Sequence, residues 1–131
     1  MKNKIKSSQE WWKYAEYDLK NAEILFRNDS YVYTVFMCYL ALEKSLKSLY
    51  TQTMNQVPPK THNLVYLTVK VNLDLPEQWA SFIKIISRIS IPTRYPEDLI
   101  QLLSEYDKNK TGEILNQTKE LIKWLEQKLV K

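Results

Sequence analysis

Apolar residues recur along most of this chain at alternating steps of three and four, the spacing of an amphipathic helix. The first such run predicts a helix over about residues 8–28. Ser7 and Glu10 stand at its start with the spacing of a capping box, in which a hydroxyl and a carboxylate each bond a free backbone N–H. The apolar stripe of this helix consists of Trp12, Ala15, Leu19, Ala22 and Phe26.

The second predicted helix, over about residues 31–50, has an apolar first half with few polar positions on any side. Such a segment needs cover from several neighbouring helices or from a second copy of the chain. We therefore expect a homodimer that associates through residues 31–42. We interpret the four tryptophans and the cluster Tyr31, Tyr33 and Tyr39 as core and interface residues rather than platforms for nucleobases.

Prolines divide the middle of the chain. Pro58 and Pro59 mark a loop, after which Thr61 is expected to cap a short third helix that continues to about residue 71. Pro76 suits the first turn of a fourth helix. The segment 92–96, with a proline at each end, is expected to end that helix.

The last third of the chain predicts a short helix over about residues 99–106, a polar loop over 107–112, and a final helix from about residue 113. No segment has the length and alternation of a strand. The sequence therefore predicts an all-α protein, an up-and-down antiparallel helical bundle of four to five helices.

Composition limits the class of protein further. A chain of 131 residues fits one domain, which we place at residues 8–131, behind a flexible basic arm at 1–7. No apolar run is long enough to cross a membrane. The basic start is not followed by an apolar segment, so we do not expect it to be a signal peptide. Cys38 is the single cysteine, which excludes an intrachain disulfide and suits the cytoplasm. The single glycine, Gly112, excludes glycine-rich phosphate loops, and the net charge of +4 permits RNA or nucleotide contact without indicating it.

Three short polar segments interrupt the apolar pattern: one in the second helix, one before the third and one after the fourth. In the first of these, Glu43 and Lys47 lie one helical turn apart, acid before base, so they can pair with each other or with a partner. Lys44 points away from them, and we expect it to be solvated. Asp18 lies on the flank of the first helix, beside its apolar stripe.

The second segment contains His62, the single histidine, which has two interpretations. It is either a structural histidine whose ring packs under the loop and bonds a carbonyl, or a contact to a phosphate or proton. Metal binding is disfavoured, because one histidine among scattered carboxylates offers no ligand spacing. The third segment holds Arg94 and Tyr95 between two prolines. There Arg94 can serve as a tether to Asp18 or Glu43, or as a contact to phosphate.

In their order and separation, these segments resemble the HEPN domain, named for higher eukaryotes and prokaryotes nucleotide-binding. The corresponding residues are Asp18-Leu19, Glu43-Lys44-Ser45-Leu46-Lys47, His62-Asn63-Leu64 and Arg94-Tyr95-Pro96, within about residues 8–130. The resemblance implies a helical bundle, commonly dimeric. It also implies that the gene often stands beside that of a small nucleotidyltransferase, as a toxin–antitoxin or related pair.

The chain departs from the ribonuclease members of the wider HEPN group, which carry an arginine followed closely by a histidine at a dimer cleft. None of Arg27, Arg88 and Arg94 has His62 a few residues after it. RNA cleavage needs a proton carrier and a group that stabilises the charge on phosphorus. The departure therefore weighs against a nuclease.

We expect a non-catalytic HEPN protein, a dimeric helical partner of a small nucleotidyltransferase with a nucleotide or RNA contact. We expect no cofactor and no metal. Two alternatives stay open: a ribonuclease toxin that uses His62 and Arg94 at a dimer cleft, and a bundle that only mediates interactions. The expected nucleotide- or phosphate-binding residues are Lys47, His62, Arg94 and Tyr95, and the acids expected to shape the site are Asp18 and Glu43.

Overall fold

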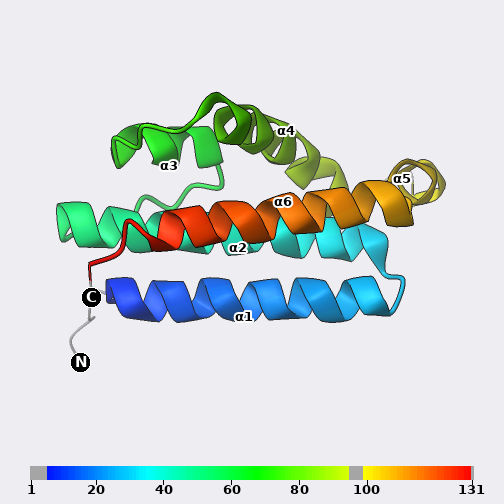
Figure 1. Cartoon of the computed structure of the whole chain (residues 1–131), viewed down its shortest axis with the longest axis horizontal. Coiled ribbons are helices and arrows are strands. Elements are labelled where there is room, and N and C mark those ends of the chain that lie inside the picture. Colours follow the sequence, from blue (N-terminus) through cyan, green and yellow to red (C-terminus); the bar gives the residue numbers. More distant parts are fainter. Residues whose placement is uncertain (1–5, 95–98, 131) are drawn as a thin grey trace.

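The computed structural model describes residues 6–94 and 99–130, and the side chains of residues 89–99 lie outside this description. The described residues form helices and no strand, which confirms the predicted all-α class. Three long helices lie side by side along the molecule, and the others cover one side and one end of them (Figure 1). The helices are α1 (Ser8–Arg27), α2 (Tyr31–Met54), α3 (Leu64–Lys70), α4 (Glu77–Arg94), α5 (Leu99–Glu105) and α6 (Lys108–Glu126).

The first helix, α1, begins where the sequence predicts. The Ser7 hydroxyl accepts a hydrogen bond from the backbone N–H of Glu10 at 3.1 Å, and the Glu10 carboxylate accepts one from the N–H of Ser7 at 2.9 Å. This is a complete capping box. After α1, Asp29 adopts a left-handed conformation with φ 61°, and α2 returns antiparallel beside α1 (Figure 1).

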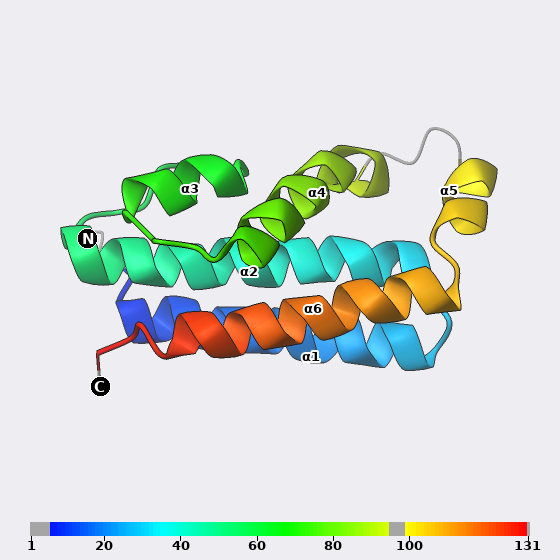
Figure 2. The same ribbon diagram turned by 45° about the horizontal axis from the view of Figure 1, so that its top comes forward.

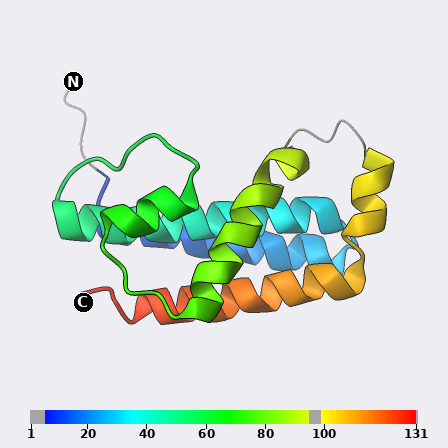
Figure 3. The same ribbon diagram turned by 90° about the horizontal axis from the view of Figure 1, so that it is seen from above.

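The central helix is α2, which packs against every other described helix. Figures 2 and 3 show α3 and α4 lying across α2 on the side away from α1, with α5 at one end of the bundle. Val35, Tyr39, Leu42 and Leu46 on α2 are fully buried. Neighbouring helices of the same chain therefore cover much of the apolar segment that the sequence assigned to a dimer contact.

The predicted start of α3 is wrong, whereas α4 ends within the segment expected to end it. Asn63 caps α3 by accepting a hydrogen bond from the N–H of Tyr66 at 3.0 Å, whereas Thr61 lies outside the helix and accepts from the N–H of Asn63 at 3.1 Å. Helix α4 passes Pro92 and ends at Arg94, inside the 92–96 segment. A proline removes one backbone donor and crowds the preceding turn, which weakens or bends a helix without always ending it.

The predicted polar loop over residues 107–112 is also wrong, because α6 begins at Lys108. The Asp107 carboxylate caps this helix by accepting from the N–H of Lys110 at 2.9 Å. Thr111 is fully buried, and a Cβ added at Gly112 would lie 3.3 Å from the ring of Phe26. The polar segment is therefore the start of a helix that packs closely on α1. Within the described ranges, no helix has both the length and the apolar content needed to cross a membrane.

Candidate functional site

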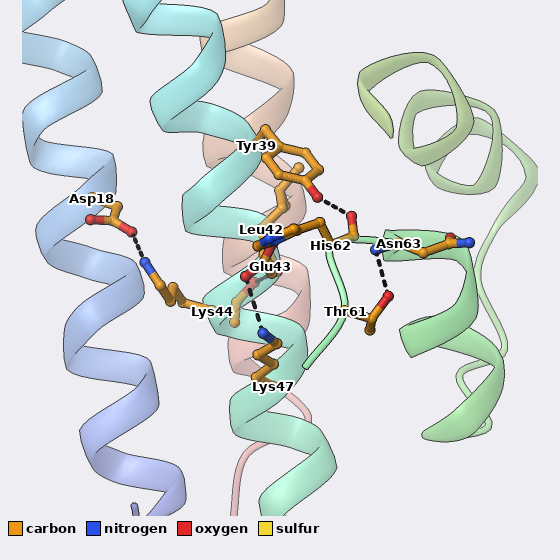
Figure 4. Close-up of polar contacts among 10 residues, drawn as sticks. Asp18, Tyr39, Leu42, Glu43, Lys44, Lys47, Thr61, His62 and Asn63 are labelled. Carbon is orange, nitrogen blue, oxygen red and sulfur yellow. Dashed lines mark hydrogen bonds and ion pairs between the residues drawn. The ribbon is translucent and has the colours of Figure 1, made fainter. Parts of the chain in front are cut away.

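The site is centred on Glu43, in the half of α2 that follows its apolar segment. The Lys47 ammonium donates a hydrogen bond to Glu43 Oε2 at 3.1 Å, and the two side chains are nearly buried, with 4% exposure for Glu43 and 10% for Lys47 (Figure 4). Their spacing allowed pairing with each other or with a partner, and the structure shows that they pair with each other. Desolvating two charges is costly, so each depends on the other to remain in this environment.

His62 supplies the second contact to the same carboxylate. Its Nδ1 lies 2.8 Å from Glu43 Oε1, while the imidazole is 60% exposed. The ring therefore does not pack under the loop, and its partner is a carboxylate rather than a carbonyl. An ionised carboxylate can only accept, so the bond places a proton on Nδ1. The other ring nitrogen, Nε2, is then an acceptor in the neutral imidazole and a donor in the imidazolium.

The backbone around His62 is held by its neighbours. The buried Tyr39 hydroxyl donates a hydrogen bond to the carbonyl of His62, and Thr61 and Asn63 bond to each other just before α3 (Figure 4). The imidazole thus has a fixed backbone beneath it and a buried carboxylate beside it. This arrangement holds the ring in one orientation and leaves Nε2 without a partner among the described contacts.

A second ion pair joins α1 and α2 beside the first. The Lys44 ammonium donates to Asp18 Oδ2 at 2.6 Å, with 14% of the lysine side chain and 5% of the aspartate exposed (Figure 4). The expectation that Lys44 is solvated is therefore wrong. The reason is tertiary: α1 packs along α2 and brings the buried Asp18 to the side of α2 from which Lys44 projects.

Arg94 and Tyr95 are the predicted site residues that cannot be added to this geometry. Arg94 is the last residue of α4 rather than part of a loop, and its side chain lies outside the described residues, as does the whole of Tyr95. Both candidate acids for the predicted arginine tether already have basic partners. Lys44 pairs with Asp18, and Lys47 and His62 share Glu43. The tether stays a prediction.

The structure also brings together a group that sequence reasoning missed. The Lys6 ammonium lies 4.5 Å from the ring centroid of Trp11 and 5.1 Å from that of Tyr14. Lys44 lies 4.0 Å from Tyr14, and Lys47 lies 5.7 Å from Trp11. We call Lys6, Trp11, Tyr14, Lys44 and Lys47 the aromatic–lysine cluster.

The cluster could have been sought from the spacing of Trp11 and Tyr14, which are three residues apart on one side of α1. The tryptophans were instead interpreted together as core and interface. Trp12 and Trp79 are buried core residues, whereas Trp11 is only partly buried. Residues 1–5 of the predicted basic arm lie outside the described residues, but Lys6 packs against α1.

Cys38 is not part of this chemistry. It is fully buried in α2, and burial raises the pKa of its thiol from 9.0 to about 12, although a hydrogen bond with Thr118 acts in the opposite direction. A thiol in this state is a poor nucleophile. In the part of the chain that the structure describes, no group of three histidine, cysteine or acidic side chains has the arrangement of a metal site.

Comparison with known proteins places this fold. The HEPN domain family model matches residues 8–128, whereas no curated protein matches the chain. The crystal structure of TT1696 from Thermus thermophilus is similar with a TM-score of 0.80 and 24% identity, over 93% of this chain and 98% of that one. ST0689, an archaeal HEPN homologue, is similar with a TM-score of 0.75 and 21% identity, over 94% of this chain and 98% of that one. The two structures show the shared fold, and because the family model spans all the described helices, the chain belongs to the HEPN domain family.

Proposed function

We propose that this chain is a non-catalytic HEPN protein that contacts the phosphate of a nucleotide or RNA through His62. The observation that carries the proposal is the bond between His62 Nδ1 and the buried Glu43, with most of the imidazole exposed. A ring held in this way offers Nε2 to a ligand without first losing side-chain freedom. Lys47 contributes by fixing the carboxylate that orients the ring.

The same geometry supports binding over catalysis. In-line cleavage of RNA needs a base, an acid and a group that stabilises the charge on phosphorus. His62 is the only histidine, and Lys44 and Lys47 are each already paired with a carboxylate. Around His62, the described residues therefore offer one histidine and two ammonium groups that are already paired, which is a limited set for that reaction.

The binding test compares two variants in the same loop. Fluorescence polarisation of a labelled nucleotide and a labelled single-stranded RNA is measured with wild type, His62→Ala and Lys60→Ala. We expect His62→Ala to weaken binding about tenfold, the value of one hydrogen bond to a charged group. Lys60→Ala removes a full charge nearby and serves as the control. A larger loss with Lys60→Ala than with His62→Ala would show that binding follows net charge rather than the imidazole.

We further propose that the chain functions as a homodimer. Tyr33 on α2 is 54% exposed, and Phe36, Met37 and Leu40 on the same helix are only partly buried within one chain. Light scattering should give a dimer at tens of micromolar for wild type, and Tyr33→Lys should favour the monomer. Val69→Lys, at an exposed position on α3, is the matched control. A monomeric wild type at these concentrations would contradict the proposal.

The proposed protein partner is a small nucleotidyltransferase, in a toxin–antitoxin-like pair. The support is the family membership together with the resemblance of the polar segments at Asp18, Glu43, His62 and Arg94 to members of that kind. The test is co-expression with a nucleotidyltransferase encoded beside this chain, followed by size-exclusion chromatography. Separate elution of the two proteins, both folded, would contradict the pairing.

One observation favours a second candidate, a ribonuclease. A histidine oriented by a carboxylate through Nδ1, with most of its side chain exposed, is also the arrangement of a general base. This candidate would need a cation near the scissile phosphate, for which the sequence offers Arg94. Cleavage of RNA by wild type and its loss in His62→Ala would favour this candidate over the first.

A further inference from the structure

The aromatic–lysine cluster is continuous with the His62 site. His62 contacts Glu43, Glu43 contacts Lys47, and the Lys47 ammonium lies over the ring of Trp11. From Trp11 the contacts continue through Lys6 to Tyr14. One chain of contacts therefore joins the candidate phosphate contact on one side of α2 to two aromatic rings on α1.

The rings of the cluster are partly accessible, although the indole N–H of Trp11 is buried, and lysine ammonium groups lie over both rings. Tyr14 is 45% exposed and Trp11 is partly exposed. Lys44 and Lys47 are each neutralised by one carboxylate, whereas Lys6 forms no ion pair with any residue that the structure describes. Lys6 is held over the two rings by cation–π attraction, so it is the cation that a ligand can engage at least cost.

We propose that the aromatic–lysine cluster binds the unpaired bases of a single-stranded nucleic acid. Bases would stack on Trp11 and Tyr14, and Lys6 would move from the ring faces to a phosphate. Stacking surfaces combined with basic side chains bind single strands with little sequence preference, because every base has a flat face. For Trp11, this replaces the interpretation as a core or interface residue.

This inference deepens the nucleotide or RNA contact proposed above by naming the ligand and a second surface for it. Two rings favour a strand with successive bases over a mononucleotide. A free nucleotide also has a base and a phosphate, so the experiment must distinguish binding of a single strand from binding of a mononucleotide. It must also separate stacking from simple attraction between lysines and phosphates.

The experiment measures polarisation of a labelled oligoadenylate of about ten nucleotides, within the span that single-strand sites cover. The variants are Trp11→Leu and Tyr14→Ala, and each should weaken binding about tenfold through lost stacking. The matched control is Trp124→Leu on α6. There Lys128 lies 4.6 Å from the ring, so this control removes a similar cation–π pair that has no place in the chain of contacts to His62. It should leave the affinity unchanged.

Two further probes make the readout specific for bases. An abasic oligomer of equal length keeps the phosphates, and it should bind about tenfold more weakly than oligoadenylate and be insensitive to the ring substitutions. Adenosine monophosphate should compete poorly. Equal binding of abasic and normal oligomers would overturn the stacking site, as would adenosine monophosphate competing as well as the oligomer.

The outcomes for this inference and for the proposed function are distinct. Loss of binding in His62→Ala with no effect of Trp11→Leu or Tyr14→Ala overturns the stacking site alone. The reverse result keeps the stacking site and overturns the phosphate contact of His62. Because Trp11 is partly buried, circular dichroism checks the fold of its variant. The more exposed Tyr14 provides the decisive substitution if Trp11→Leu is unfolded.

Discussion

Replacing Glu43 by glutamine tests whether the centre of the site is a buried ion pair. The substitution keeps the volume of the side chain and removes its charge. It leaves the Lys47 ammonium 3.1 Å from a neutral amide in a position where only 10% of the lysine side chain is exposed. Removing one member of a buried pair costs about 3–5 kcal/mol, because the remaining charge stays desolvated. We therefore expect the free energy of unfolding to fall by about that amount.

The assay is urea denaturation followed by circular dichroism, with the slope compared between variants to confirm that the same surface unfolds. The matched control is Glu23→Gln, which breaks the ion pair of Glu23 with Lys119 at 3.3 Å. This pair is much more exposed, so its loss should cost less than about 1 kcal/mol.

A double variant makes the test informative even if Glu43→Gln is barely stable. Glu43→Leu combined with Lys47→Met removes both charges and should recover most of the lost stability, since no charge is left unpaired. The reasoning would be refuted if Glu43→Gln cost no more than Glu23→Gln. That result would mean that Lys47 reaches water easily and that Glu43 is free to reorient His62.

Three other expectations follow from the structure. Burial raises the pKa of Cys38 from 9.0 to about 12, so as pH rises the unfolded chain loses the thiol proton before the folded chain does. Below pH 9, the difference in free energy of unfolding between wild type and Cys38→Val should therefore be constant. Between pH 9 and about 12, the wild type should lose about 1.4 kcal/mol per pH unit relative to Cys38→Val. A flat difference across this range, measured by urea titration at each pH, would contradict it. Ser7→Ala removes one hydrogen bond of the capping box and should lower the free energy of unfolding by about 1 kcal/mol, with Ser104→Ala on α5 as an exposed serine control. The purified chain should not cleave a labelled single-stranded RNA. Cleavage by wild type that disappears in His62→Ala would contradict the non-catalytic function and favour the ribonuclease.

The sequence predicted those parts of the fold that depend on local signals. The capping box at Ser7 and Glu10 placed the start of α1 correctly. At the start of α6, the polar residues before Gly112 concealed a helix whose buried side includes Thr111. Asp107, a helix-capping residue type within the segment interpreted as a loop, was the signal that could have indicated a helix start there. Local propensity favoured a loop there, and packing against α1 decided otherwise.

For the site, sequence spacing was sufficient only within one helix. Glu43 and Lys47 are one turn apart on α2, so their pairing was among the expected outcomes. The contact of Lys44 with Asp18 depends on how α1 lies against α2, and the contact of His62 with Glu43 depends on the path of the chain before α3. Neither is encoded in a short motif. Lys6 was missed for the same reason, because its contacts are defined by the orientation of α1 side chains.

The pairing pattern also determines which groups remain for a ligand. The central helix α2 carries three charged residues beside its core, and their desolvation is offset by Asp18 from α1 and by His62 from the segment before α3. Lys44 is therefore committed to joining α1 to α2, and Lys47 is committed to its pair with Glu43 within α2. Within the His62 site and the aromatic–lysine cluster, the basic side chains left to meet an anion are Lys6 and the exposed imidazole, at separate points of one chain of contacts. Attraction for phosphate should consequently be modest, and selectivity for unpaired bases should come from the rings of Trp11 and Tyr14 that lie along that chain.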